Sequence, residues 1–492
     1  MNALKKIRTS PRSRIFLVLY LCAAAFIVSM QSPMNPFYTT LGGVDSSVFH
    51  YVASVIEQGG LPYRDTFDHK GPLLYLINYL GLKISYYSGA WLLEYFTLVL
   101  WNALTYRTAR LFCGRLASCA VVFFSGAALF SCFFGGNFPE VYALPCITGA
   151  LYIFTDYFLH QKISPFRLFL CGAALASALM LKPNTIAVWV VFSLAVLVQA
   201  IREKNLSVIP RFLGFFLLGF VVVLLPFLLY FVRNGIFTDF IDTYFRFNFL
   251  YAGAEGDSST LKVVVNFLFC EWAFPSLVLA ALLFRQKTEE RFFWGAYLLF
   301  LLLSVAFCGM SGNEYVYYRI SMLPCYALPL AAFLRGVRFD LRRESFQLLA
   351  AVMAAVFALC WYTPTVKALG LLKLTSSEVH LGDEHHQAIF ELIEENTTPD
   401  DRILVYGNED SFYFYSHRFA ASKYSFQYPI VLIDEDIRNE FFQQITENHP
   451  KLIIVQSLWC DDEYIKAFLQ SHPEYVCITD FSDYAVYQYT GA

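Results

Sequence analysis

The sequence contains few charged residues for its length. Asp, Glu, Lys and Arg make up 15% of its 492 residues, whereas 57% are hydrophobic, including 50 Phe and 32 Tyr. So much apolar surface exceeds what one water-soluble core could bury. The net charge of −3 is also too small to indicate nucleic acid or another strongly charged partner. These shortages favour an integral membrane protein with the lipid bilayer as its surroundings.

Other features are absent too. No internal repeat or low-complexity tract occurs, which weakens the case for a transporter built from matched halves. The basic start Lys5-Lys6-Ile-Arg8 precedes an apolar run, and we expect it to be an uncleaved anchor rather than a cleavable signal peptide. The apolar segments hold few ionisable groups, and Glu94 and Asp156 lie near segment ends. A lipid-linked saccharide transporter or flippase therefore remains the second hypothesis.

Apolar segments long enough to cross, or nearly cross, a bilayer recur along the chain. We count eleven, at about 15–31, 89–111, 116–135, 138–159, 167–181, 184–201, 212–232, 263–284, 292–310, 320–334 and 346–364. The fifth and sixth are short and meet at Lys182. The predicted fold class is an α-helical polytopic membrane protein of about 11 spans, with a transmembrane domain over residues 1–364.

Basic residues are distributed unevenly between the two predicted sides. With a cytoplasmic N-terminus, the inside segments carry 20 Lys and Arg residues, the outer loops carry eight, and the last eight lie in the C-terminal region. Under the positive-inside rule this bias places the N-terminus on the cytoplasmic side of the cytoplasmic (plasma) membrane. An odd number of spans then places residues 365–492 outside.

The C-terminal region, residues 365–492, has a water-soluble composition. Helical patterns at 385–396 and 435–448 alternate with buried-strand patterns at 402–407 and 451–456, which predicts a small extracytoplasmic α/β domain. The turn after the first strand lacks a glycine-rich phosphate loop, so a nucleotide site has little support there. We interpret the region as an accessory domain.

Two further readings of this domain stay open. Its tyrosines could stack on an acceptor sugar or serve as ordinary core and rim residues, the commoner role; they are Tyr406, Tyr413, Tyr415, Tyr424 and Tyr428. Cys460 and Cys477 could form a disulfide, although no dense cysteine framework surrounds them. The other ten cysteines lie in or beside apolar segments, where cysteine packs as a small apolar residue.

The first outer loop, residues 32–88, concentrates polar and aromatic residues just outside the bilayer. It holds Asp45, Tyr63, Arg64, Asp65, Asp68, His69 and Lys70. Val44, Val48, Val52 and Val55 recur at helical spacing, which predicts an amphipathic helix along the membrane surface. Asp45 would then lie at the interface, although an isolated Asp at a helix start is most often a cap. The crowding of such side chains in a loop indicates an enzyme rather than a conduit.

Other polar residues fall on the same predicted side. They are Asn137, Glu140, Lys182, Arg246, Glu314 and Arg319. Lys70 and Lys182 stand at span ends, at the depth of a lipid phosphate, although a single lysine there more often snorkels to the interface. Glu140 could simply favour the first turn of a helix, through the helix dipole. Their convergence on one side indicates a site.

This pattern resembles the GT-C glycosyltransferases, especially the bacterial polyprenyl-phosphate-sugar enzymes related to protein O-mannosyltransferases and to the lipid A aminoarabinose transferase. The resemblance covers roughly residues 10–335. It is carried by residues 43–51, 60–72, 137–140 and 181–182. This chain has Asp45-Ser46 where the family often has paired acidic residues, and Lys70-Gly-Pro in place of Lys-Pro-Pro.

The resemblance implies a role for each polar residue. Asp45 corresponds to the catalytic base, Glu140 to the second acidic residue, and Lys70 and Lys182 to the lysines that hold the donor phosphate. A sugar leaving a lipid phosphate needs cations rather than a general acid, so Arg319 is added to the phosphate-binding set. The loop residues Tyr63, Arg64, Asp65, Asp68 and His69 are expected to contact donor or acceptor.

The sequence therefore predicts an inverting hexosyl- or pentosyltransferase. It would move one sugar from a polyprenyl-phosphate donor to an envelope acceptor (a glycolipid, wall polymer or protein) at the outer face of the membrane. One carboxylate stands where the family often has two, so we expect no tightly held divalent metal and no other cofactor. A third hypothesis is an envelope polymerase or ligase with a diphosphate-linked donor; the long loop after the first span argues against it.

Overall fold

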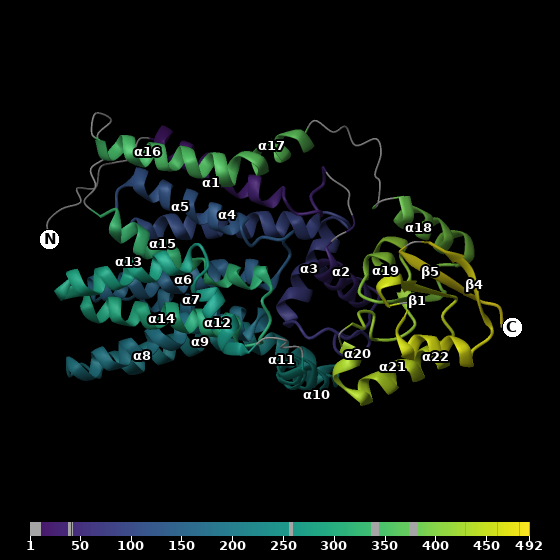
Figure 1. The fold of residues 1–492 in the computed structure, drawn as a ribbon. Coiled ribbons are helices and arrows are strands. Elements are labelled where there is room, and N and C mark those ends of the chain that lie inside the picture. Colours follow the sequence, from purple (N-terminus) through teal and green to yellow (C-terminus); the bar gives the residue numbers. More distant parts are fainter. Residues whose placement is uncertain are drawn as a thin grey trace.

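The computed structural model describes residues 11–37, 41, 43–254, 259–335, 344–372, 382, 384–428, 430–459, 461–481 and 483–491. A bundle of helices makes up most of the molecule, and the C-terminal α/β region lies at one end of it (Figure 1). Helices α2 (Val44–Glu57) and α3 (Pro72–Ile84), from the first loop, lie between the bundle and that region.

Every apolar segment predicted from the sequence folds as helix. The bundle contains α1 (Pro11–Ser29), α4 (Gly89–Ala109), α5 (Arg115–Phe130), α6 (Pro139–His160), α7 (Pro165–Leu181), η1 (Pro183–Thr185), α8 (Ala187–Arg202), α9 (Val208–Arg233), α10 (Phe237–Ile241), η2 (Asp242–Phe247), α11 (Asn248–Ala254), α12 (Thr260–Leu268), α13 (Ala273–Gln286), η3 (Thr288–Glu290), α14 (Arg291–Gly309), η4 (Val316–Met322), α15 (Pro324–Phe333), α16 (Glu344–Val356), η5 (Phe357–Trp361) and α17 (Tyr362–Leu371). Their order along the chain follows the predicted order of segments.

Five helical stretches within the described residues are long and apolar enough to cross a membrane by length and composition. They are α1, α6, α9, Thr288–Gly309 and Gln347–Leu371. A sixth arises if α12 and α13 count as one span, and five shorter apolar helices accompany them. The chain is thus a multi-pass membrane protein, and the predicted count of eleven spans stays a prediction.

Two predicted segments are less regular than the sequence indicated. The segment predicted at 263–284 is broken: α12 and α13 meet at an angle of 70° across a break of a few residues. The segment predicted at 320–334 divides into a 3₁₀ turn, η4, and the short helix α15, whose first residue is Pro324. Proline suits the first turn of a helix, where its missing N–H has no partner to lose.

Helices α7 and α9 cross at unusually short range. A Cβ on Gly172 would lie 1.9 Å from the Phe216 carbonyl oxygen, and one on Gly219 would lie 1.9 Å from that of Phe169. Small residues at such a crossing let two backbones pack directly, a common device in membrane helices. The contact fixes the helix that ends at Leu181, directly before Lys182.

Helix α2 confirms the helical spacing of the valines but not the predicted surroundings. Phe49 and Val52 are buried, and the Tyr51 hydroxyl accepts a hydrogen bond from the Ala420 backbone N–H at 2.9 Å. The expectation that this apolar face meets the membrane is therefore wrong, because it packs inside the protein; the position of α2 along the membrane surface stays a prediction. Nor does Asp45 cap the helix, because Gly43 is the N-cap residue and no side-chain capping hydrogen bond is formed.

The C-terminal region contains a five-stranded mixed sheet in the order β2-β1-β3-β5-β4. Its elements are α18 (Glu384–Asn396), β1 (Arg402–Tyr406), α19 (Ser411–Ser416), β2 (Phe419–Ala420), α20 (Ile430–Ile433), α21 (Glu435–Asn448), β3 (Leu452–Gln456), η6 (Ser457–Trp459), α22 (Glu463–Ser471), β4 (Tyr475–Asp480) and β5 (Tyr484–Tyr489). Strands β2, β1 and β3 pair in parallel, whereas β5 pairs antiparallel with β3 and β4. The sequence patterns did not predict the hairpin formed by β4 and β5.

The tyrosines of this region are mostly core residues. Tyr406, Tyr413, Tyr424 and Tyr428 are all at most 2% exposed, which agrees with the commoner of the two roles considered above. Cys477 is exposed, and Cys460 lies outside the described residues, so their pairing stays a prediction.

Candidate functional site

Two cavities meet where the first loop, the helix bundle and the C-terminal region come together. The larger, of about 360 Å³, contains Asp45 and Asp68 in its lining. The smaller, of about 260 Å³, has a mostly apolar lining and contains Lys182. Four residues line both cavities: His69, Lys70, Tyr251 and Tyr318. We call the first the carboxylate cavity and the second the apolar cavity.

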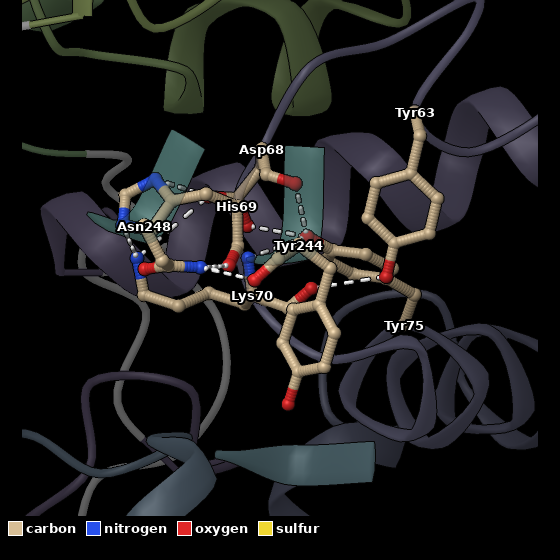
Figure 2. Close-up of polar contacts among 7 residues, drawn as sticks. All are labelled: Tyr63, Asp68, His69, Lys70, Tyr75, Tyr244 and Asn248. Atoms are coloured by element: carbon tan, nitrogen blue, oxygen red, sulfur yellow. Dashed lines mark hydrogen bonds and ion pairs between the residues drawn. The ribbon is translucent and has the colours of Figure 1, made fainter. Parts of the chain in front are cut away.

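Lys70 lies at this junction, and its backbone is held from both sides. The Tyr63 hydroxyl donates to the Lys70 carbonyl oxygen at 3.0 Å, and the Lys70 N–H donates to the Tyr75 hydroxyl oxygen at 3.1 Å (Figure 2). Tyr75 in turn donates to Asp68, with its hydroxyl 2.9 Å from Oδ2. The two tyrosines thus fix the peptide that carries the ammonium group.

The Lys70 ammonium group has two close neighbours. It lies 3.0 Å from Nε2 of His69 and 3.7 Å from Oδ1 of Asp68. An ammonium only donates, so Nε2 is the acceptor. Burial, and then the nearby Lys70 and Lys182, hold the pKa of His69 well below its usual range. His69 is therefore neutral, and Lys70 supplies the positive charge at the junction.

Asp68 is a buried carboxyl group in this cluster. Burial raises its pKa, while Lys70 and the Tyr75 hydroxyl act in the opposite direction. Asn248, the first residue of α11, donates its side-chain amide to the His69 carbonyl oxygen at 2.8 Å. Figure 2 shows side chains from the first loop, α3, η2 and α11 converging on one place.

Lys182 and Glu140 form a buried ion pair. The ammonium lies 2.5 Å from Oε1 of Glu140, which is 1% exposed, and 3.5 Å from the centre of the Tyr318 ring. Lys182 lines the apolar cavity, whereas Glu140 lines neither cavity. Glu140 therefore holds Lys182 in place, and Tyr318 stabilises the same cation through its ring face.

Asp45 lies in the carboxylate cavity beside a stack of aromatic rings. The Tyr317 hydroxyl hydrogen-bonds the Asp45 carboxylate. The Tyr317 ring lies between those of Phe138, at 4.2 Å and nearly parallel, and Tyr315, at 5.6 Å. Burial and then Asp45 raise the pKa of Tyr317, so its hydroxyl keeps its proton and acts as the donor.

Behind Asp45, the Asn137 side chain joins several helices. Its amide donates to the hydroxyl oxygen of Ser46 at 2.9 Å and to Oδ1 of Asn78 at 2.9 Å, and its carbonyl oxygen accepts from Tyr142. The Asn137 backbone N–H donates to Glu94 at 2.5 Å. Because Ser46 follows Asp45, this network fixes the turn that carries the predicted base.

Five of the predicted site residues line one or both cavities: Asp45 and Asp68 line the carboxylate cavity, Lys182 lines the apolar cavity, and His69 and Lys70 line both. The Tyr63 hydroxyl hydrogen-bonds the Lys70 backbone. Arg64 pairs with Asp239 at 2.7 Å on the surface, and Asp65 accepts from the Leu61 N–H. Neither Arg64 nor Asp65 lines a cavity.

Arg319 is also outside both cavity linings. Its guanidinium lies 3.7 Å from Glu271 and 5.5 Å from the centre of the Phe267 ring. The structure does not bring Arg319 together with Lys70 and Lys182, because η4 directs Tyr317 and Tyr318 toward the site. Arg246 pairs with exposed Asp242, and Glu314 accepts from Asn266.

Sequence reasoning missed several cavity residues. Tyr251, from α11, lines both cavities; Asn408, Phe426 and Ile430 line the carboxylate cavity from the C-terminal region, together with Tyr428, one of the tyrosines considered above for stacking on a sugar. Tyr251 lies in an outer loop on the predicted side, but no charge or glycine distinguishes it. The described residues contain no group of three or more His, Cys, Asp or Glu side chains placed to hold a metal ion.

Solved structures show what this fold resembles. ArnT from Cupriavidus metallidurans bound to undecaprenyl phosphate superposes with a TM-score of 0.64 at 15% identity, over 97% of this chain and 98% of that one. The apo state of the same protein gives 0.63. The oligosaccharyltransferase of Archaeoglobus fulgidus in its apo form gives 0.51 at 14% identity, over 91% of this chain and 70% of that one. The fold is therefore that of the GT-C glycosyltransferases.

The sequence itself matches a family model. The model described as "Putative competence-induced protein Ccs4 N-terminal domain" matches residues 3–370, and the chain belongs to this family. No curated protein matches the sequence. The GT-C resemblance inferred from the first loop is thus confirmed at the level of the fold.

Proposed function

We propose that the protein is an inverting glycosyltransferase that moves one sugar from a polyprenyl-phosphate donor to an acceptor in the cell envelope. The observation that supports this most is the position of Lys70, at the junction of an apolar cavity and a cavity that holds Asp45. A lipid-phosphate sugar has the matching order of parts: an apolar chain, an anion and a sugar. Undecaprenyl phosphate is bound in the ArnT structure.

The donor lies with its phosphate between Lys70 and Lys182. Its first isoprenoid units occupy the apolar cavity, beside residues such as Leu181, Ile186 and Phe307. The sugar then extends into the carboxylate cavity. Two fixed cations stabilise a phosphate whose charge increases as the sugar leaves.

The reaction is a single displacement. As Asp45 accepts the proton of the acceptor hydroxyl, the hydroxyl oxygen forms a bond to the anomeric carbon. The bond from that carbon to the phosphate oxygen breaks, and its electron pair stays on polyprenyl phosphate, which leaves with one more negative charge. Because the acceptor enters opposite the leaving phosphate, the anomeric configuration inverts. Lys70 and Lys182 balance the added charge, and no cofactor is required in this scheme.

This proposal places the site at the outer face of the cytoplasmic membrane. The uneven distribution of lysine and arginine supports that orientation, and with it an extracytoplasmic C-terminal region. Helices α2 and α3, which flank the loop that carries Lys70, lie at the end of the bundle next to the C-terminal region (Figure 1), so this loop and that region would both face the envelope.

The test is mass spectrometry of envelope polymers and polyprenyl-phosphate sugars. A deletion strain is complemented with wild-type protein or with Asp45→Asn. We expect the variant to lose one sugar from an envelope acceptor and to accumulate the lipid-linked sugar, because its amide cannot accept the proton. General-base catalysis contributes about 10²- to 10⁴-fold. Identical profiles in the two strains would remove Asp45 as the base.

Transport is tested separately. Purified protein in detergent has no membrane to separate two sides, so sugar transfer there excludes a flippase as the sole activity. Equal transfer by wild type and Asp45→Asn in that assay would again count against the mechanism, whereas loss confined to the variant supports it.

A further inference from the structure

One side of the carboxylate cavity belongs to the C-terminal region. Asn408, Phe426, Tyr428 and Ile430 line this cavity, and none of them lines the apolar cavity. We call these four residues the C-terminal wall. The wall therefore faces Asp45 and is separated from the lipid-binding half of the proposed site.

The wall is held rigidly. Gln427 accepts from the Gly407 N–H at 2.9 Å and donates to the carbonyl oxygens of Tyr424 and Ser425. The Tyr428 hydroxyl donates to Asp462 at 2.5 Å. So many short contacts fix the segment before any ligand binds, which lowers the entropic cost of binding.

The wall is also fixed to the helix bundle. Phe426 packs against the large core of the bundle and against the core of the C-terminal region. The Phe67 backbone N–H, in the first loop, donates to the Lys423 carbonyl oxygen at 2.8 Å. The wall and the loop that carries Lys70 therefore behave as one unit.

The geometry of an inverting displacement determines which substrate lies against the C-terminal wall. The acceptor oxygen and the leaving phosphate lie on opposite sides of the anomeric carbon. The phosphate lies toward Lys70 and Lys182, so the acceptor lies on the side of Asp45, which is also the side of the wall. The donor's lipid and phosphate are then out of reach of Asn408 and Phe426.

The chemistry of the lining restricts the acceptor. Lys70 is the one Lys or Arg among the residues that line the carboxylate cavity, and the donor phosphate engages it. The wall adds two aromatic rings, one amide and one aliphatic side chain. Aromatic faces and an amide suit the ring and hydroxyl groups of a sugar, whereas an acceptor phosphate would find no free cation among these lining residues.

We propose that the C-terminal wall is the acceptor subsite and that it receives a hydroxyl group of an uncharged sugar unit. This inference rests on the proposed transferase activity and goes beyond it, since it assigns the acceptor to a separate region and excludes an acceptor phosphate. Phe426 contacts the acceptor ring, and Asn408 hydrogen-bonds its hydroxyl groups.

The experiment uses the full-length protein in detergent. The donor is the polyprenyl-phosphate-sugar fraction from a deletion strain, and the acceptor is the envelope glycan fraction from the same strain. Two products are measured: sugar on the acceptor, and free sugar released when water takes the acceptor's place. For Phe426→Ala and Asn408→Ala we expect the acceptor KM to rise about three- to tenfold, because each loses about one hydrogen bond or stacked ring, while donor hydrolysis stays within about twofold of wild type.

Control variants distinguish a loss of acceptor binding from misfolding. Tyr464→Ala removes an exposed ring of the same region that lines neither cavity, and it should leave both products unchanged. Phe426→Leu removes the ring but keeps more of the packing volume than Phe426→Ala, so its thermal midpoint should stay closer to wild type while the acceptor KM still rises. Equal losses of transfer and hydrolysis in the wall variants, or an unchanged acceptor KM, would overturn the assignment.

The linkage of the product tests the class of acceptor. Mild acid cleaves a glycosyl phosphate and leaves a glycoside on a carbon-bound hydroxyl intact, so we expect an acid-stable product. An acid-labile product would overturn the hydroxyl assignment while leaving the transferase activity standing. If wild type neither transfers nor hydrolyses the donor, the proposed function itself fails, and the subsite with it.

Discussion

The two cavities differ in chemistry although they share four residues. The apolar cavity contains two lysines and no carboxylate, whereas the carboxylate cavity contains Asp45 and Asp68 with a single lysine at its edge. In the proposed reaction, the apolar cavity supplies the cations and apolar surface that a lipid phosphate requires, and the carboxylate cavity supplies the base. Lys182 is thereby separated from Asp45, whereas Lys70 reaches both cavities. Lys70, at the junction, is the residue on which the comparison depends.

Removing the shared lysine should have the largest effect. Lys70→Met keeps an unbranched side chain but removes the charge, so the leaving phosphate loses a fixed cation. Loss of one such group typically costs about 10²- to 10³-fold in rate. The measurement is the rate of sugar transfer by purified protein. Lys83→Met is the matched control, since Lys83 pairs with Glu57 on the surface and lines neither cavity. Similar losses in both variants would contradict a specific role.

Variants of the Lys182–Glu140 pair distinguish the contribution of Lys182 to donor binding from its contribution to the stability of the protein. Lys182→Met leaves Glu140 buried without its partner, which costs about 3–5 kcal/mol in buried pairs, so the thermal midpoint should fall. The double variant with Glu140→Gln should regain most of that midpoint while its donor KM stays about 10- to 100-fold above wild type. Full recovery of donor binding in the double variant would show that Lys182 serves only the ion pair.

A variant of Tyr317 tests the carboxylate cavity. Tyr317→Phe keeps the ring stacked on Phe138 and removes the hydroxyl that donates to Asp45, so transfer should fall about tenfold. The measurement is the rate of sugar transfer by purified protein, and an unchanged rate would mean that the Tyr317 hydroxyl does not act on Asp45.

The last prediction concerns stability rather than activity, at the contact between the two regions. Burial raises the pKa of Asp410 to about 7, and Asp68 and Glu409 contribute to the rise. The folded protein thus binds this proton more tightly than the unfolded chain, so stability falls as pH rises from about 4 to about 7. The loss is of order 4 kcal/mol at most. Asp410→Asn should flatten this part of the pH dependence, as measured by thermal midpoints at pH 5 and pH 8. An unchanged slope would show that Asp410 does not titrate in this range.

Local patterns in the sequence predicted much of this molecule. Long apolar runs gave the helices of the bundle, and alternating helix and strand patterns gave the C-terminal core at β1, β3, α18 and α21. The first loop was singled out because Asp68, His69 and Lys70 stand together in the chain. Each of these signals lies within a short stretch of sequence.

The features that the sequence did not predict depend on contacts between residues that are distant in the chain. The valine spacing of α2 indicates an apolar face but not its partner, so the membrane was expected where the protein itself packs. Arg319 and Tyr317 are two residues apart in η4, and only the tertiary structure shows which of them faces Asp45. Asn408 and Phe426 lie more than 350 residues from Asp45, and no local pattern places them in one cavity.

The anchored peptide of Lys70 affects how fast its side chain can respond. Tyr63 and Tyr75 hold its carbonyl oxygen and its N–H, while the side chain ends between the two cavities. Following the phosphate from one cavity to the edge of the other therefore requires only rotation about side-chain bonds, which takes picoseconds to nanoseconds for mobile side chains. Loop closure takes up to milliseconds in many enzymes. In the proposed reaction, Lys70 therefore responds quickly to the leaving group, because its backbone does not have to move.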